Sequence, residues 1–574
     1  MDSEGQHTLL TTPSELLFHV FTFLDVPSIL ALRQTCKSLS LLTHDKGVWL
    51  DQLRHQRNSL PLPSPARDDV SALALTPEEL EKIVVSAHAS QHAWHRPRQE
   101  VTHLGGLQAD YRDIIYLTVL LDRLVLCVYS HGSVVLWNVA SNSAKMRARV
   151  IHPQSYWELW GLEPWTSAVA CLDNGNEAAY VAITRAQNRT QQGSATVLMR
   201  IPLDETASYE APYLGSVNRD QTEDLTQPPP GSRNLNFNDV DTIFGPDAQV
   251  VRTIDPAQQI IAFSRTTHID VTHWPTNTGI TLDTQREDVD QLWNGIIALQ
   301  FIGPYLLCIK ARTLELYPIS LPFSSRTSYF VSSSLGPPTP PEPQGDSHDD
   351  VPVPPRRPVA LHSFPRTTFR GASISSSLPR SHCAASAAPD ETATSPIVLT
   401  LLAHDVLRGV FQYRVNIVPA SSTARPSSFP IPPTLHVDLI GVHNMALGVP
   451  GFVSAAAIGP QGRRGVWVER TKKVTTRRVV VFSTPACDDA PDDGDVEQPR
   501  PVTLPLQFVD AENDLSDEEE GREDGAWGLG KPINTHPVYE VKSYDLHEDL
   551  VQVAFSEVSG LIALGTRAGA VRVI

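Results

Sequence analysis

The stretch TTPSELLFHVFTFLDVPSILALRQTCKSLSLLTHDKGVWLDQL, residues 11–53, predicts three short helices. Thr12, Pro13 and Glu15 have the order of a capping box with proline at the first helical position, so the first helix is expected to begin here. A second helix is expected from Pro27, and a short third helix follows a polar break. The rest of the chain is interpreted outward from this unit.

The apolar residues of this stretch recur at three- and four-residue steps, which places them on one helical face. In the first helix they are Leu16, Leu17, Val20, Phe21 and Leu24. A unit this small has more apolar surface than it can bury within itself. We therefore expect it to dock on another protein or, as an ordinary amphipathic hairpin, on the rest of this chain.

The order of these residues resembles an F-box, the part of F-box proteins that binds the Skp adaptor. Pro13-x-Glu15-Leu16-Leu17 opens the pattern, and it runs on through Cys36-Lys37-Ser38-Leu39 to Val48-Trp49. F-box proteins are substrate receptors of Skp–cullin–F-box ubiquitin ligases. The adaptor-facing positions that the resemblance implies are Pro13, Leu16, Leu17, Phe21, Leu24, Leu30, Cys36, Leu39 and Trp49.

A second resemblance follows the F-box. Residues 76–79 again have the order of a capping box and open a helix with an apolar face, which ends near the Trp-x-x-Pro segment at 94–97. This arrangement is similar to the linker of many fungal F-box proteins, where it joins the F-box to a β domain and fixes their orientation. A plain surface helix is the alternative.

At about residue 111 the spacing of the apolar residues changes from one typical of helices to one typical of β-strands. Residues 124–138 resemble one blade of a WD-repeat propeller, with Asn138 in the place of the usual aspartate. Weaker units follow at 168–203, 249–274, 294–321, 397–419, 451–485 and 550–574. Seven units favour a closed propeller over a pair of β-sandwiches. The final strand would complete a blade begun by the earliest β segment after the linker.

Length and composition bound the protein. A chain of 574 residues with 41% hydrophobic content is expected to form two or three domains, and 47 prolines against 32 glycines indicate long insertions. No run of 18 apolar residues occurs, so neither a membrane span nor a standard export signal is expected. A net charge of −18 argues against nucleic acid and anionic membranes as partners.

The six cysteines lie far apart and form no Cys-x-x-Cys pair. Reduced thiols in the cytoplasm or nucleus are therefore expected, with no disulfide framework, no metal site and no cofactor. The Walker, dinucleotide-binding, nucleophile-elbow and His-Glu-x-x-His patterns do not occur either. We expect no catalytic residues.

The predicted fold class is an α+β multidomain protein, in which a small all-α F-box precedes an all-β domain, a seven-bladed β-propeller with long disordered insertions. The predicted divisions are a flexible N-terminus 1–10, the F-box 11–57, a linker with one helix 58–110, the propeller 111–574, and insertions at 215–238, 324–395 and 486–527. The insertions are rich in proline, serine or acidic residues and bury too little apolar surface to become ordered.

A basic run stands out on this acidic chain. Its cations are Arg463, Arg464, Arg470, Lys472, Lys473, Arg477 and Arg478. One hypothesis is a docking site for an acidic or phosphorylated substrate, because arginine pairs bidentately with such groups. A solvated turn beside the chain's own acidic tract and a nuclear-import or nucleic-acid patch are alternatives. Thr339 and Ser516 resemble proline-directed and acid-directed kinase sites.

These observations favour the substrate-recognition subunit of a Skp–cullin–F-box ligase, whose β domain binds an unknown protein substrate. Two other classes stay open. One is a propeller scaffold that acts without cullin, and the other is a propeller enzyme whose site is assembled from residues distant in sequence.

Overall fold

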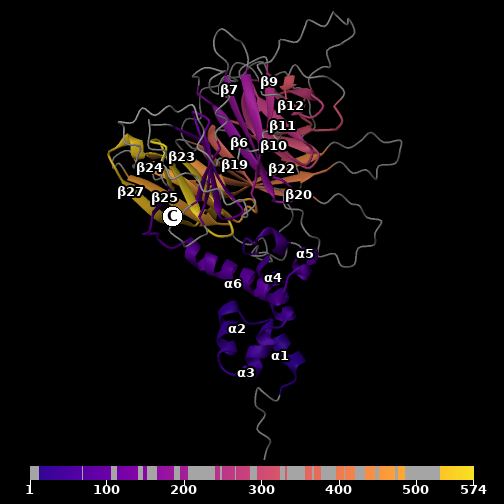
Figure 1. The fold of residues 1–574 in the computed structure, drawn as a ribbon, viewed down its shortest axis with the longest axis vertical. Helices are drawn as coiled ribbons and strands as arrows, with labels where there is room; N and C mark the ends of the chain where they lie inside the picture. The colour runs from indigo at the N-terminus through magenta and orange to yellow at the C-terminus, as the bar shows by residue number, and fades with distance from the viewer. Residues whose placement is uncertain are drawn as a thin grey trace, which may run out of the picture.

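A computed structural model of the chain shows a helical region at one end and a ring of β-sheets at the other (Figure 1). The residues that the structure describes are 12–57, 59–67, 69–104, 113–139, 147–151, 164–186, 194–203, 240–245, 249–265, 267–284, 294–323, 330–332, 356–364, 367–375, 396–405, 408–419, 433–445, 451–471, 476–484 and 531–574. The predicted flexible N-terminus and the predicted insertions 215–238 and 486–527 lie outside them.

The N-terminal unit has four helices where the sequence predicts three. They are α1 (Ser14–Phe21), α2 (Val26–Arg33), α3 (Lys37–Thr43) and α4 (Lys46–Arg57). The predicted second helix is wrong because the chain becomes extended at Cys36, with φ −156° and ψ 160°, which separates α2 from α3. The capping box predicted at Thr12 is also wrong, since Pro13 occupies the N-cap of α1 without a side-chain bond.

The linker completes the core of this helical unit. It contains a 3₁₀ turn η2 (Ser64–Ala66), α5 (Asp69–Ala74) and α6 (Pro77–Trp94). Leu80 and Val84 of α6 are fully buried in one cluster with Trp49 and Leu53 of α4. The helical unit therefore buries part of its apolar surface against its own linker. The prediction of a single linker helix is wrong, because α5 precedes α6.

The capping box that begins α6 is confirmed. The Thr76 hydroxyl accepts a hydrogen bond from the backbone N–H of Glu79 at 3.2 Å, and the Glu79 carboxylate accepts one from the N–H of Thr76 at 2.8 Å. Both donors would otherwise be unpaired at the helix start.

Seven sheets form the ring, which confirms the predicted seven-bladed propeller, and within the described residues their strands pair antiparallel except β22 with β26. Blade 1 is β2 (Ile114–Leu120), β3 (Leu124–Tyr129), β4 (Val134–Asn138) and β5 (Arg147–Ile151). Blade 2 is β6 (Ser167–Leu172), β7 (Ala178–Ala186), β8 (Ser194–Pro202) and β9 (Val240–Gly245). Blade 3 is β10 (Val250–Asp255), β11 (Ile260–Ser264), β12 (His268–His273) and β13 (Thr278–Asp283).

The other blades follow the same plan. Blade 4 is β14 (Ile296–Ile302), β15 (Tyr305–Lys310), β16 (Thr313–Pro318) and β18 (Ala360–Ser363). Blade 5 is β19 (Phe369–Ile374), β20 (Ile397–Asp405), β21 (Gly409–Val418) and β22 (Thr434–Asn444). Blade 6 is β23 (Gly451–Ile458), β24 (Arg464–Thr471), β25 (Thr476–Ser483) and β27 (Thr535–Lys542). Two further strands, β17 (Phe330–Ser332) and β26 (Lys531–Pro532), pair with β9 and β22.

Blade 7 closes the ring with strands from both ends of the chain. It is β28 (Leu550–Phe555), β29 (Ile562–Thr566), β30 (Val571–Val573) and β1 (Thr102–Leu104). β1 pairs antiparallel with β30, and Leu104 lies opposite Val571. The final strand shares its blade with a strand from the start of the β region, as predicted, but that strand is β1 and not the first strand after residue 110. The domain start predicted at 111 is wrong, because β1 lies within the predicted linker.

The insertion predicted at 324–395 is too wide. β17, β18 and β19 all lie within it, and Phe364 and Phe369 are buried in the core of blades 4 and 5. Short strands surrounded by proline and serine give no alternating pattern long enough to recognise in the sequence.

We expect Leu104→Asp to open the ring, because the fully buried Leu104 would be replaced by a carboxylate without a partner. The free energy of unfolding should fall by about 3 kcal/mol, measured as a lower midpoint of denaturant unfolding. The matched control is His103→Asp, since the neighbouring His103 side chain is exposed. An equal loss in both variants would contradict a role for β1 in closing the ring.

Candidate functional site

An exposed apolar face lies at the end of the molecule that is farthest from the propeller (Figure 1). Leu16 and Val20 of α1 and Phe23 just after it are exposed, as is Leu41 of α3. Leu16 and Val20 are spaced by four residues, which places them on the same side of α1, and Phe23 lies in the turn that follows the helix. The Phe23 ring makes an edge-to-face contact with His19, with the centroids 5.1 Å apart.

The other predicted adaptor-facing residues divide into two groups. Pro13 is exposed like Leu16, and Leu24, Leu30 and Cys36 are partly exposed. Four others, Leu17, Phe21, Leu39 and Trp49, are buried in the core of the helical unit. The prediction that these four face a partner is wrong, because they hold the helices together.

Sequence reasoning missed Val20, Phe23 and Leu41 as candidate contacts. A signal for Phe23 was present, since apolar residues occur at 16, 17, 18, 20, 21, 23 and 24 and cover more than one helical face. The surplus apolar positions indicate a second surface, but the period does not tell which surface is buried.

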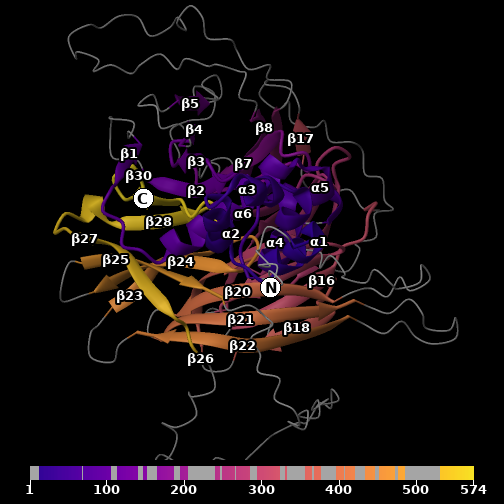
Figure 2. The same cartoon turned by 90° about the horizontal axis from the view of Figure 1, so that it is seen from below.

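The end of α6 joins the helical unit to blades 6 and 7. The helices lie over the face of the propeller that is turned to the viewer in Figure 2. Trp94 is fully buried, and its ring lies 5.5 Å from that of Phe555 in β28. The indole N–H donates a hydrogen bond to the carbonyl oxygen of Phe482 in β25 at 3.1 Å. A single side chain of α6 therefore contacts both blades.

Arg464 is the centre of this junction. Its guanidinium donates to Ser90 Oγ, Gln91 Oε1 and the carbonyl oxygen of Glu557, each at 2.8 Å. It also lies over the Trp94 ring, 5.1 Å from the centroid. Burial lowers the pKa of Arg464 to about 10, against the opposing charge of Glu557, so the side chain remains a cation at neutral pH.

The carboxylate of Glu557 links blade 7 to a turn of blade 6. It accepts hydrogen bonds from the backbone N–H groups of Gln461 and Arg463 at 2.5 Å and of Arg464 at 3.0 Å. Burial raises the pKa of Glu557, and the three backbone donors and the Arg464 cation oppose that shift.

Two more bridges fix the junction. The Arg98 guanidinium donates to the carbonyl oxygens of Ile574 at 2.7 Å and Gly560 at 2.8 Å. The side-chain amide of Gln461 donates to the carbonyl oxygen of Leu62 at 2.8 Å and accepts from its N–H at 3.2 Å. Contacts at Leu62, α6 and Arg98 together prevent the helical unit from rotating on the propeller.

The predicted basic docking hairpin is wrong as a single cluster. Arg464 lies at the start of β24 and Arg470 lies six residues further along the same strand, so the two are about 20 Å apart. β25 runs antiparallel to β24 and brings Arg477 opposite Arg470. Arg464 is buried in the junction, and Arg477 is buried beside Asp549. Arg478 forms an ion pair with Glu540 at 3.0 Å. Arg463 lies in the turn before β24 and is partly exposed. The last two cations, Lys472 and Lys473, and the kinase-site candidates Thr339 and Ser516 lie outside the described residues.

Within the described ranges, no three His, Cys, Asp or Glu side chains gather as a metal site. Over those same ranges, no helix is long and apolar enough to cross a membrane.

A protein-family comparison identifies residues 12–54 as F-box-like. No curated protein sequence matches the chain. The region that the family comparison matches contains α1, α2 and α3 and most of α4, and therefore contains the exposed apolar face.

The solved structures that the chain is similar to include three propellers. The β-propeller domain of Myceliophteria thermophila Cps50 (Swd1) is 8% identical with a TM-score of 0.38, covering 82% of this chain and 99% of that one. The WD40 propeller domain of Doa1 is 10% identical with a TM-score of 0.34, covering 83% and 97%. The C-terminal WD40 domain of Sif2 is 8% identical with a TM-score of 0.39, covering 83% and 98%.

We expect Arg464→Ala to loosen the junction, because Ser90 and Gln91 lose their donor and the Glu557 carboxylate loses the favourable charge of Arg464. Hydrogen exchange at the amides of α6 should become at least about tenfold faster, measured by mass spectrometry.

The matched control is Arg463→Ala. Arg463 is the neighbouring residue, and within the described part of the chain its side chain makes no hydrogen bond or ion pair. Unchanged exchange in α6 of the Arg464→Ala variant would show that Trp94 and Arg98 hold the junction without it.

Proposed function

We propose that this chain is the substrate-recognition subunit of a Skp–cullin–F-box ubiquitin ligase. The helical unit would bind a Skp adaptor, and the propeller would bind the protein to be modified. The observation that carries the proposal is the exposed apolar face of Leu16, Val20, Phe23 and Leu41 inside the F-box-like region. Exposed large apolar side chains that gather in one short region are typical of protein interfaces.

The position of this face supports the proposal. An adaptor bound to α1 would lie at the opposite end of the molecule from the far face of the propeller, so both surfaces could be occupied together (Figure 1). The bridged junction at Arg464 and Arg98 would hold a bound substrate at one place relative to the ligase. Such positioning raises the effective concentration of substrate lysines at the ligase.

The proposal assigns the transfer of ubiquitin to the partners and none of its chemistry to this chain. It places the protein in the cytoplasm or nucleus, where such ligases act. A scaffold that binds the adaptor without cullin is the second candidate, because the F-box-like match covers only the region of adaptor contact. Recovery of cullin with the adaptor-bound chain distinguishes the two functions.

We expect Leu16→Lys and Phe23→Arg each to abolish capture of a purified Skp adaptor by the full chain, because a charge would be buried at the apolar contact. The measurement is a pull-down with the circular dichroism spectrum as a check of folding. Both side chains are exposed, so the helices should keep their stability.

Val70→Lys of α5 is the matched control. Val70 is 81% exposed and Phe23 is 76% exposed, but Val70 lies outside the F-box-like region. Failure of the folded wild-type chain to capture adaptor would contradict the proposal, as would equal loss in the Val70→Lys control.

A further inference from the structure

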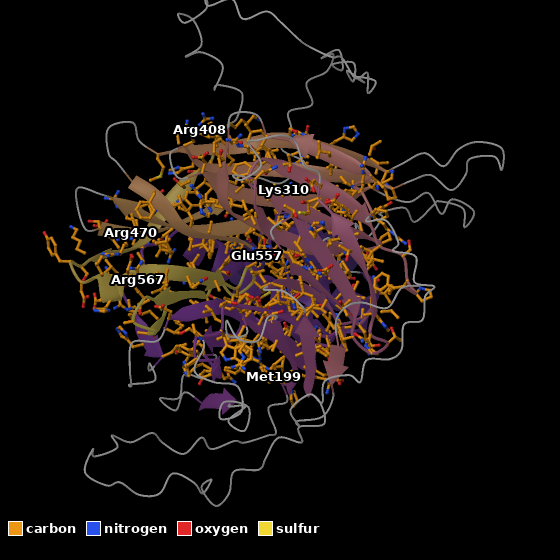
Figure 3. All side chains as sticks on the ribbon, turned by 90° about the horizontal axis from the view of Figure 1, so that it is seen from above. Met199, Lys310, Arg408, Arg470, Glu557 and Arg567 are labelled. Atoms are coloured by element: carbon orange, nitrogen blue, oxygen red, sulfur yellow. The ribbon has the colours of Figure 1, made fainter. Side chains whose placement is uncertain are left out.

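Three arginines surround one buried aspartate at the edge of blades 6 and 7. The Asp549 carboxylate lies 2.8 Å from Arg470, 2.9 Å from Arg477 and 3.6 Å from Arg567. Figure 3 labels Arg470 and Arg567 beside one another at the rim of the propeller. Among the described residues, one carboxylate therefore forms ion pairs with all three of these cations.

This cluster lies at the end of the strands opposite to the helices. β24 starts at Arg464 in the junction and carries Arg470 near its other end. β29 starts after the loop that contains Glu557 and ends beside Arg567. A strand of six residues spans about 20 Å, so the arginine cluster and the helical unit occupy opposite faces of the propeller.

Arg470 and Arg567 retain donors for a partner. Arg567 is half exposed, and Asp549 is its one ion-pair partner among the described residues. Arg470 is partly exposed and lies over the Phe452 ring, 5.1 Å from the centroid. A guanidinium has five N–H donors, and one carboxylate cannot satisfy those of three arginines. The unfilled donors are suited to a further carboxylate or a phosphate.

The loop 543–549 beside the cluster is fixed in place. The buried Arg477 donates a hydrogen bond to the carbonyl oxygen of Ser543 at 2.7 Å. At the other end of the loop, the backbone N–H of Arg567 donates to the carbonyl oxygen of Asp549 at 2.8 Å. Both ends are therefore anchored, and the conformation between them is set before any partner binds.

This anchored loop presents two apolar side chains to solvent. Tyr544 is 92% exposed, and Leu546 is also exposed. A tyrosine side chain has only two rotatable χ angles, so it offers a large contact area at a low cost in conformational entropy. Two acidic side chains lie in the same loop: Asp545 accepts a hydrogen bond from the backbone N–H of His547 at 2.8 Å, and Glu548 lies 3.4 Å from Arg572.

We propose that Arg470, Arg567, Tyr544 and Leu546 form a docking surface for an acidic segment of a protein partner. Anionic side chains of that segment bind the two guanidinium groups, and an apolar side chain next to them contacts Tyr544 and Leu546. This inference deepens the proposed function, on which it rests for the role of the partner as substrate. The binding itself does not require the adaptor.

A peptide fits this surface better than a nucleic acid. The cluster is small, and the chain as a whole carries a net charge of −18, which repels a long polyanion. An acidic peptide presents a few anions and an apolar side chain over a short length, and this matches two guanidinium groups beside a tyrosine and a leucine.

The test uses the full chain without adaptor and three fluorescein-labelled peptides. One contains glutamates and leucines, one has glutamine in place of every glutamate, and one has phosphoserine in place of two glutamates. We expect the glutamate peptide to bind at low salt by fluorescence anisotropy and the glutamine peptide not to bind. Tighter binding of the phosphoserine peptide would assign phosphate as the preferred anion, and equal binding would assign carboxylate.

Arg567→Gln should weaken binding of the glutamate peptide about tenfold, and Tyr544→Ala should weaken it at low and high salt alike. Arg478→Gln is the matched control. The Arg478 side chain is 50% exposed and forms an ion pair with Glu540, and the Arg567 side chain is 52% exposed and forms an ion pair with Asp549. The inference would be overturned if the glutamate peptide did not bind, or if Arg567→Gln and Arg478→Gln weakened its binding equally. It would also be overturned if an oligothymidine of the same charge bound as tightly as the peptide. A chain that captures adaptor but no peptide would leave the proposed function intact.

Discussion

The buried guanidinium of Arg464 is the interaction on which the arrangement of this molecule depends. It joins two side chains of α6 to the backbone of blade 7, and the same turn of blade 6 binds the Glu557 carboxylate. Removing a cation and a carboxylate from water costs several kcal/mol each, so such a cluster persists only when its hydrogen bonds are nearly complete. Any change that separates α6 from the propeller leaves these groups buried without partners.

This constraint makes the helical unit and the propeller one body, with the two proposed binding surfaces at its ends. The apolar face of α1 lies at one end, and the arginine cluster around Asp549 lies on the propeller face at the other. A flexible linker would allow a bound partner to sample a large volume. The bridged junction instead keeps the two surfaces at one separation and one orientation, which is the property a substrate receptor needs.

The elements that have strong local signals could be predicted from the sequence. The capping box at Thr76, the helical period of 11–53 and seven groups of short strands all correspond to observed elements. Which apolar residues of α1 are buried could not be predicted, because Phe21 and Phe23 are both apolar and only tertiary packing separates them. The junction could not be predicted either, since Arg464 and Glu557 are distant in sequence. Antiparallel pairing divides the basic run between two faces, and no linear pattern contains that information.

Electron cryomicroscopy of the full chain bound to a Skp adaptor tests the account most directly. The account predicts one orientation of the propeller relative to the adaptor, with density for α6 and the Trp94 side chain and with the Asp549 face directed away from the adaptor. A well-resolved adaptor and helical unit followed by a propeller in many orientations would contradict the rigid junction.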